Sequence, residues 1–126
     1  DQAMSVVERL SGLGIGVAID DFGTGYSSLS YLKYLKADRL KIDRRFVRDL
    51  PDDKDDAAIA RAVIALGLSL GFQVVAEGVE SEAQEDFLRA GGCHQGQGYL
   101  YAAPMPADDF ERWLRHRRFQ VATAAA

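Results

Sequence analysis

Apolar segments and helical patterns alternate along this chain, and that alternation constrains its fold more than any other feature. Four apolar segments, at residues 15–19, 39–42, 73–76 and 94–100, are each followed by a helix-like pattern. Strands that alternate with helices predict a parallel sheet with right-handed crossovers. The chain is therefore expected to be an α/β protein.

The helices are predicted from apolar residues at three- and four-residue spacing and from capping residues. They cover residues 1–10, 28–35, 57–70, 81–90 and 106–117, and Ser81 is the expected cap of the fourth. One helix thus precedes four β-α units. Four strands do not close a (β/α)8 barrel, which typically needs about 250 residues. Half of a TIM-type barrel is the economical interpretation.

Composition narrows the class of protein. The 126 residues are 48% hydrophobic and 27% charged, which favours a folded globular chain, and the net charge of −4 argues against a DNA-binding protein. No apolar stretch approaches the roughly 20 residues that cross a bilayer, and the single cysteine, Cys93, suits a reducing compartment. We expect a cytoplasmic segment without membrane contact, cut from a longer parent whose membrane anchor, if it has one, lies in domains absent here.

Polar side chains stand at or near the end of each predicted strand. Asp20 and Asp21 follow the first strand, Lys41 lies within the second, Glu77 follows the third, and Gln97 belongs to the fourth. The carboxyl ends of parallel strands meet at one edge of the sheet, where α/β proteins hold their active sites. The five side chains are therefore expected to surround one site.

Each of these residues also has an ordinary explanation when taken alone. The two aspartates could cap a turn, Lys41 could form a structural salt bridge, and Gln97 could form a core hydrogen bond. Their coincidence at one edge favours chemistry instead. Hard oxygen ligands without histidine or cysteine suit Mg²⁺ or Mn²⁺, and such metals assist the hydrolysis of phosphate esters. Lys41 suits a phosphoryl oxygen or the attacking water.

Longer motifs carry a resemblance to a known family. They are Asp-Asp-Phe-Gly-Thr-Gly-Tyr-Ser-Ser-Leu at 20–29, Lys-Ile-Asp-Arg-Arg-Phe-Val at 41–47, Ala-Glu-Gly-Val-Glu at 76–80, and Gln-Gly-Tyr at 97–99, followed by Pro104. In order and spacing they resemble the C-terminal half of the EAL domain, from residue 1 to about residue 114. The resemblance implies the second half of a (β/α)8 barrel over residues 1–118, with 119–126 as a C-terminal tail. It also implies hydrolysis of cyclic di-GMP to pGpG in bacterial signalling, with Mg²⁺ or Mn²⁺ as cofactor.

The resemblance assigns a role to each residue of the predicted site. It implies that Asp20 bridges two metal ions and that Asp21 serves the second. It implies that Lys41 positions the lytic water or binds the metal-bound cluster, and that Glu77 is a metal ligand or a general base near that water. Gln97 would contact the substrate or a water.

The resemblance also assigns a loop. Residues of the glycine-rich segment would couple dimerisation to metal and substrate binding: Phe22, Gly23, Thr24, Gly25, Tyr26, Ser27 and Ser28. Glu80 is similar to an acid of the family's next loop and is expected to support the first.

The family's first half has no counterpart in this chain. The glutamate of the Glu-Ala-Leu signature, an asparagine and a further glutamate all belong to that half, and a metal ion that needs about six oxygens is poorly held by the remainder. We therefore expect an inactive fragment that forms a homodimer or associates with the missing half, because a half barrel exposes sheet edges. The alternative is a non-catalytic module from a degenerate EAL domain that binds cyclic di-GMP, dimerises or acts as a scaffold.

Overall fold

Four parallel strands form one sheet in the order β1-β2-β3-β4, which confirms the predicted α/β class. The structure is a computed structural model that describes residues 2–25 and 29–125. The strands are β1 (Ala18–Phe22), β2 (Arg39–Ile42), β3 (Gln73–Glu77) and β4 (Gln95–Gln97). The helices are α1 (Gln2–Gly12), α2 (Leu29–Tyr34), the short 3₁₀ helix η1 (Arg44–Phe46), α3 (Lys54–Ser69), α4 (Glu82–Ala90) and α5 (Ala107–Ala125).

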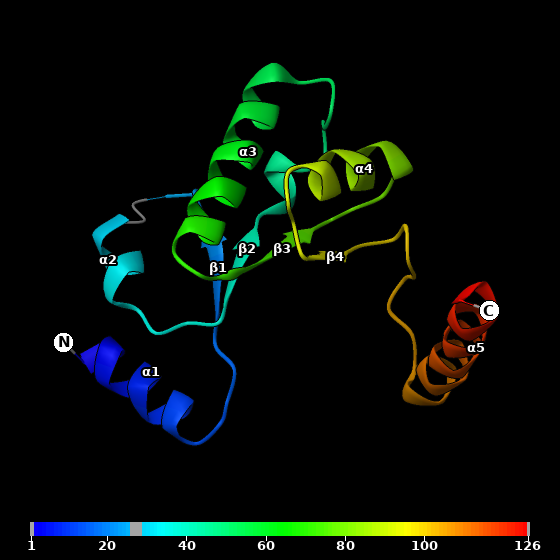
Figure 1. Ribbon diagram of the computed structural model, residues 1–126, viewed down its shortest axis with the longest axis horizontal. Coiled ribbons are helices and arrows are strands. Elements are labelled where there is room, and N and C mark those ends of the chain that lie inside the picture. Colours follow the sequence, from blue (N-terminus) through cyan, green and yellow to red (C-terminus); the bar gives the residue numbers. More distant parts are fainter. Residues whose placement is uncertain (1, 26–28, 126) are drawn as a thin grey trace.

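The core lies between the two central strands and α3. Leu40 and Ile42 of β2 pair with Val74 and Ala76 of β3, and all four residues have no exposed surface. Helix α3 packs on both strands, with α4 beside it (Figure 1). The approach of α3 to β3 is close, because a Cβ on Gly67 would lie 2.5 Å from the Cγ2 atom of Val74. The central strands are thus the best-packed part of the molecule.

Capping side chains set the N-termini of the two helices that cover the sheet. Asp53 accepts hydrogen bonds from the N–H groups of Asp55 and Asp56, so α3 begins three residues before its predicted start. Ser81 forms a capping box with Gln84 at the start of α4, which confirms the predicted cap.

The first strand lies three residues later than predicted. Residues 13–15 close α1 instead of entering the sheet, since the N–H of Ile15 donates to the carbonyl of Leu10 and Gly14 adopts a φ of +76°. Asp20 and Asp21 consequently lie inside β1, not after it. Phe22 is the one buried residue of this strand, so the expected buried strand is here an exposed edge.

The C-terminal third also departs from its expected bounds. Only Gln95–Gln97 of the predicted strand 94–100 pair with β3. Helix α5 continues to Ala125, so residues 119–125 of the expected tail extend that helix. In Figure 1, α5 lies to one side of the sheet and is joined to it by an extended segment.

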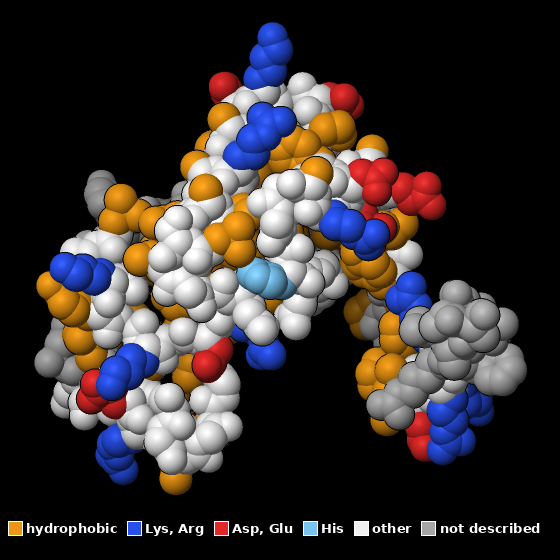
Figure 2. Space-filling model, in the orientation of Figure 1, with side chains coloured by type: hydrophobic (Ala, Val, Ile, Leu, Met, Phe, Trp, Pro, Cys, Tyr) orange, Lys and Arg blue, Asp and Glu red, His pale blue; other side chains and the backbone are white. Residues whose placement is uncertain are grey.

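Hydrophobic side chains remain exposed at both ends of the molecule. Leu29, Tyr31 and Tyr34 are exposed on α2. Tyr99 is exposed in the segment before α5, and Phe110 is exposed on α5. Figure 2 shows hydrophobic surface in both places. In the described part of the chain, no helix has the length and apolar character that crossing a membrane requires.

Candidate active site at the carboxyl ends of the strands

Three charged side chains from three neighbouring strands meet at the carboxyl edge of the sheet. Lys41 of β2 lies between Asp20 of β1 and Glu77 of β3. Its Nζ is 3.4 Å from Oδ2 of Asp20 and forms an ion pair with Oε1 of Glu77. The side chains of Lys41 and Glu77 are 22% and 21% exposed, so the pair is sheltered yet open to a ligand. The structure thus brings together three of the residues that the sequence assigned to one site.

Strand register places a fourth predicted residue beside them. Gln97 of β4 pairs directly with Glu77 of β3. A hollow of about 300 Å³ opens at this point, and its lining is Arg44, Glu77, Gly78, Glu80, Gln97, Gly98 and Tyr99. Gln97 and Glu77 can therefore contact one bound molecule.

The backbone at Asp21 is strained. Asp21 has a φ of +54°, and the pairing of β1 with β2 shifts between Ile19 and Phe22. The Asp20 carboxylate accepts the N–H of Asp21 at 2.8 Å, and the N–H and hydroxyl of Thr24 both donate to the Asp21 carbonyl. Positive φ is uncommon outside glycine, and such strain tends to occur at functional sites. In a regular strand adjacent side chains point to opposite faces, and the backbone at Asp21 departs from that regular geometry.

Charge interactions fix the protonation of two residues at this edge. The hydrogen bond with Glu77 raises the pKa of Lys41, and the smaller effect of burial opposes it, so the ammonium group stays charged at neutral pH. Hydrogen bonding from the backbone N–H of Arg45 lowers the pKa of Asp43, with a further contribution from Asp21. Asp43 caps η1 and was not assigned to the site, although the Lys-Ile-Asp motif contains it.

The glycine-rich loop begins at the same edge. Phe22 is buried in the core, and Gly23 has a φ of +89° with the Phe46 ring so close that a Cβ would lie 3.3 Å from it. Thr24 is half-buried and Gly25 is exposed. The remaining residues assigned to this loop, Tyr26, Ser27 and Ser28, lie outside the described residues. Glu80 is exposed and lines the hollow beside Glu77, while its own N–H donates to Gln84.

The described residues provide part of a metal site. Asp20, Asp21 and Glu77 are hard oxygen donors of the kind that Mg²⁺ and Mn²⁺ prefer. Within residues 2–25 and 29–125, however, no group of three or more His, Cys, Asp or Glu side chains converges closely enough to hold a metal ion. The donor chemistry fits such a metal, and the number of donors does not complete its coordination.

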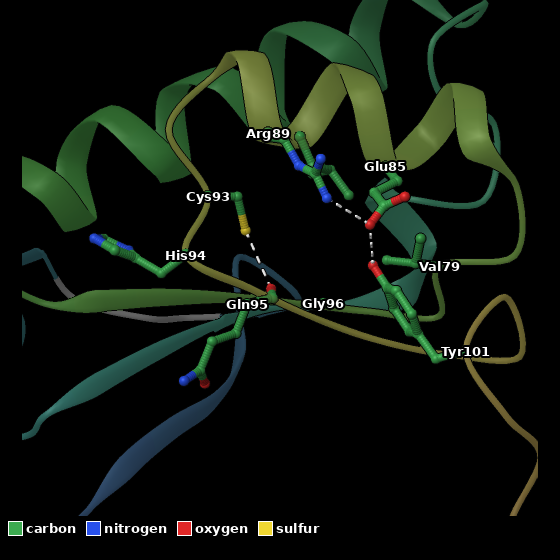
Figure 3. A pocket seen from close by; sticks show the side chains of 9 residues that line it. Val79, Glu85, Arg89, Cys93, His94, Gln95, Gly96 and Tyr101 are labelled. Carbon is green, nitrogen blue, oxygen red and sulfur yellow. Dashed lines mark hydrogen bonds and ion pairs between the residues drawn. The ribbon is translucent and has the colours of Figure 1, made fainter. Parts of the chain in front are cut away.

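A second hollow, of about 70 Å³, lies beneath α4 (Figure 3). The Tyr101 hydroxyl donates to Glu85 at 3.2 Å, and Arg89 also donates to Glu85, at 2.9 Å. The thiol of Cys93 donates to the carbonyl of Gln95, and burial raises the pKa of this thiol. A protonated thiol is a poor nucleophile, and the contacts described in this hollow join its own lining residues to one another.

Comparison with known proteins identifies the family. The family model described as the EAL domain matches residues 1–104. The chain belongs to the EAL domain family. It corresponds to the C-terminal half of this domain, as the motifs predicted.

Two relatives illustrate the likeness in sequence. The bifunctional diguanylate cyclase/cyclic di-GMP phosphodiesterase MucR of Pseudomonas aeruginosa is 56% identical over 108 residues, which are 86% of this chain and 16% of MucR. The cyclic di-GMP phosphodiesterase PdeR of Escherichia coli is 47% identical over 113 residues, 90% of this chain and 17% of PdeR. This chain therefore spans about a sixth of the length of these relatives.

The solved structures carry the same fold. The P. aeruginosa MucR phosphodiesterase in complex with cyclic di-GMP superimposes with a TM-score of 0.83 at 55% identity, covering 87% of this chain and 44% of that one. Klebsiella pneumoniae BlrP1 with manganese and cyclic di-GMP gives a TM-score of 0.74 at 39% identity, covering 82% of this chain and 26% of that one. The four-stranded sheet is therefore half of a TIM-type barrel.

Proposed function

We propose that this chain is the C-terminal half of a cyclic di-GMP phosphodiesterase that produces pGpG by two-metal catalysis. The observation that carries the proposal is the position of Lys41 between the carboxylates of Asp20 and Glu77. A basic group among acids at the carboxyl edge of a parallel sheet suits phosphodiester hydrolysis. The relatives named as cyclic di-GMP phosphodiesterases support the same substrate.

Each residue of the site has a distinct task in this proposal. Asp20 and Asp21 would hold Mg²⁺ or Mn²⁺, which polarises a phosphoryl oxygen and lowers the pKa of a bound water when present. Lys41, charged at neutral pH, donates hydrogen bonds to the attacking water or to a phosphoryl oxygen. Glu77 orients Lys41 through their ion pair and accepts the proton of the attacking water. Gln97 contacts the substrate beside Glu77.

The chain alone is proposed to be inactive. Its described residues do not complete a metal site, and hydrolysis needs the donors of the other half of the barrel. Exposed apolar side chains on α2 and near α5 support association with that half or with a second copy. The glycine-rich loop at residues 22–28 would link such a dimer to the site, with Glu80 as its support. We place this activity in the cytoplasm.

The test compares two proteins. The first is the 126-residue chain alone. The second, called the MucR chimera, joins the whole chain behind the N-terminal half of the MucR EAL domain. Both are incubated with cyclic di-GMP and Mg²⁺, and pGpG is measured by liquid chromatography. We expect turnover by the chimera and none by the chain; robust turnover by the chain alone would contradict the need for the other half.

Two observations favour a second function. Lys41 already neutralises part of the charge of Asp20 and Glu77, and the described residues hold no complete metal cluster. A degenerate EAL domain that binds cyclic di-GMP without hydrolysing it would have these features. A folded chimera that binds cyclic di-GMP by calorimetry, yet releases no pGpG with either Mg²⁺ or Mn²⁺, would establish this alternative.

A further inference from the structure

A buried glutamine links the backbone segments that follow the two central strands. Gln84, in the first turn of α4, is 6% exposed and is the buried polar side chain of the described core. Its Oε1 accepts the N–H of Glu80 at 2.7 Å and the N–H of Ser81 at 3.1 Å. Its Nε2 donates to the carbonyl of Arg48 at 2.9 Å, across 36 residues of sequence. One side chain thus joins the loop after β3 to the turn after β2.

The amide orientation at Gln84 has no workable alternative. A flipped amide would turn its NH₂ group towards the N–H groups of Glu80 and Ser81, and its oxygen towards the Arg48 carbonyl. The NH₂ group would then face two N–H donors, and the amide oxygen would face a carbonyl oxygen. Such unpaired polar groups are costly in a buried site. The contacts therefore require both an acceptor and a donor at this position.

Backbone hydrogen bonds also hold the two segments that Gln84 joins, close to the site residues. After Lys41, the N–H of Arg48 donates to the carbonyl of Arg44 at 2.9 Å, which closes the turn. After Glu77, the N–H of Val79 donates to the carbonyl of Gln97 at 3.0 Å. Neither segment can therefore move far without breaking these bonds.

A second contact holds the same two segments together. Gly78, with a φ of +74°, lies against Arg44 so closely that a Cβ on Gly78 would be 2.7 Å from the Cβ of Arg44. Glu77 precedes this glycine, and η1 begins at Arg44, three residues after Lys41. The Gly78 contact and the Gln84 bridge thus fix the two segments at points on either side of Val79.

The ion pair at the site cannot provide this precision alone. The side chains of Lys41 and Glu77 are each about one-fifth exposed, and an ion pair between two long side chains with several rotatable bonds does not by itself fix the backbones that carry them. Catalytic groups must be placed accurately, because small displacements reduce rates strongly. The accuracy must then come from the backbone on which the two side chains stand.

We propose that Gln84 is a positioning residue for this phosphodiesterase, and that its bond to the Arg48 carbonyl sets Glu77 relative to Lys41. The proposal rests on the proposed function. Gln84 touches neither the hollow nor a reacting atom, so it acts through Glu77 and not as a catalytic residue. Its neighbour Glu85 faces the other hollow, where it binds Tyr101 and Arg89 (Figure 3).

Gln84→Glu separates the two functions of this side chain, which are to accept the N–H groups at the start of α4 and to donate to the Arg48 carbonyl. A carboxylate still accepts the N–H groups of Glu80 and Ser81, as glutamate does in a capping box, so α4 keeps its cap. As an ionised carboxylate it cannot donate to the Arg48 carbonyl and places a second acceptor against it, so the bridge between the two segments is lost. Gln84→Met, which has similar length, removes both functions and serves as a second variant.

Ser81→Ala is the matched control. It removes the hydrogen bond from the N–H of Gln84 to the Ser81 hydroxyl, at 3.2 Å, and weakens the cap of the same helix. It leaves the bonds of the Gln84 side chain in place. Loss of such a cap costs about 1 kcal/mol, so thermal stability falls while the bridge stays intact.

The experiment measures kcat, KM and the melting temperature of these variants in the MucR chimera, with cyclic di-GMP and Mg²⁺. We expect Gln84→Glu to lower kcat by about 10- to 100-fold with KM within about twofold, since positioning affects the transition state more than binding. Gln84→Met should lower kcat at least as much, and Ser81→Ala should lower the melting temperature with kcat unchanged. Unchanged kcat in Gln84→Glu would overturn the proposal, and so would kcat losses that follow melting temperature in all three variants.

Amide exchange separates failure of this inference from failure of the proposed function. A wild-type chimera without hydrolysis would overturn the proposed function. The Val79 N–H donates to the Gln97 carbonyl, and its exchange rate then tests whether Gln84 holds the loop after β3 in place. Faster exchange in Gln84→Glu than in Ser81→Ala supports the positioning of this loop by Gln84, and equal rates contradict it.

Discussion

The centre of the sheet and its β1 edge meet at the same site but are built differently. At the centre, β2 and β3 pair without a break, and Leu40 and Val74 are fully buried. At the edge, the β1 pairing shifts, Asp21 has a positive φ, and the Asp20 side chain is 55% exposed. The centre therefore holds its half of the site by packing, whereas the edge holds its carboxylates by local hydrogen bonds.

This difference indicates which strands of the chain depend on contacts with another part of the barrel. Lys41 and Glu77 stand on strands whose neighbours are supplied by this chain. Asp20 and Asp21 stand on a strand with one neighbour, and α1 before it buries none of its residues. We therefore expect the centre to tolerate little change and the edge to depend on contacts with the N-terminal half of an EAL domain.

The largest expected effect comes from Lys41→Met in the MucR chimera. The substitution keeps the length of the side chain and removes its charge and its donors, so kcat should fall by about 100- to 1000-fold. The control is Lys36→Met, because Lys36 is exposed and, among the described residues, pairs with the exposed Glu8 at 3.5 Å. Equal kcat values for the two variants would show that the centre does not carry the chemistry.

Leu40→Ala tests the packing of the centre. Leu40 has no exposed surface, so the free energy of unfolding of the chimera should fall by about 2–5 kcal/mol. Asp52→Ala, at an exposed acid in the loop before α3, should change it by less than about 0.5 kcal/mol. Urea unfolding measures both, and similar losses would show that the packing of Leu40 does not stabilise the centre.

Asp21→Gly tests the strain at the edge. Glycine adopts positive φ without steric cost, so stability should rise by about 0.5–1 kcal/mol while pGpG production is lost with the carboxylate. Asp21→Ala is the comparison, since it removes the same carboxylate and keeps the strain. If the two variants have the same melting temperature, the backbone at Asp21 is not strained.

The smallest expected effect is that of pH on the Lys41 ion pair. The pKa of Lys41 is raised above its ordinary value of 10.5, so the pair stabilises the fold fully below that value and is lost as pH rises through the folded pKa. The difference in stability between wild type and Lys41→Met should thus stay level from about pH 7 to pH 9.5 and shrink only above about pH 10.5. A decline already at pH 8 would contradict this.

Local sequence signals predicted the elements and the meeting of the central residues. Ser81 was identified as a cap because capping depends on residues a few positions apart. Lys41 and Glu77 were placed together because apolar segments reveal strands and parallel strands align their carboxyl ends.

Contacts between distant parts of the chain were not predictable in the same way. The shift of β1 depends on how residues 13–15 close α1, and the positive φ of Asp21 depends on the pairing with β2. The bridge from Gln84 to Arg48 spans 36 residues, and no local pattern indicates it. Spacing shows which residues share an edge, but the orientation of each depends on tertiary contacts.

The most direct test of the site is hydrolysis of cyclic di-GMP by the MucR chimera carrying Asp20→Asn. Asp20 belongs to the edge and contacts Lys41 of the centre, so its carboxylate joins the two regions at the site. We predict that this variant folds and releases almost no pGpG in Mg²⁺, while Asp52→Asn, at an exposed loop acid, retains wild-type turnover. Equal turnover by the two variants would contradict the assignment of the active site to this edge of the sheet.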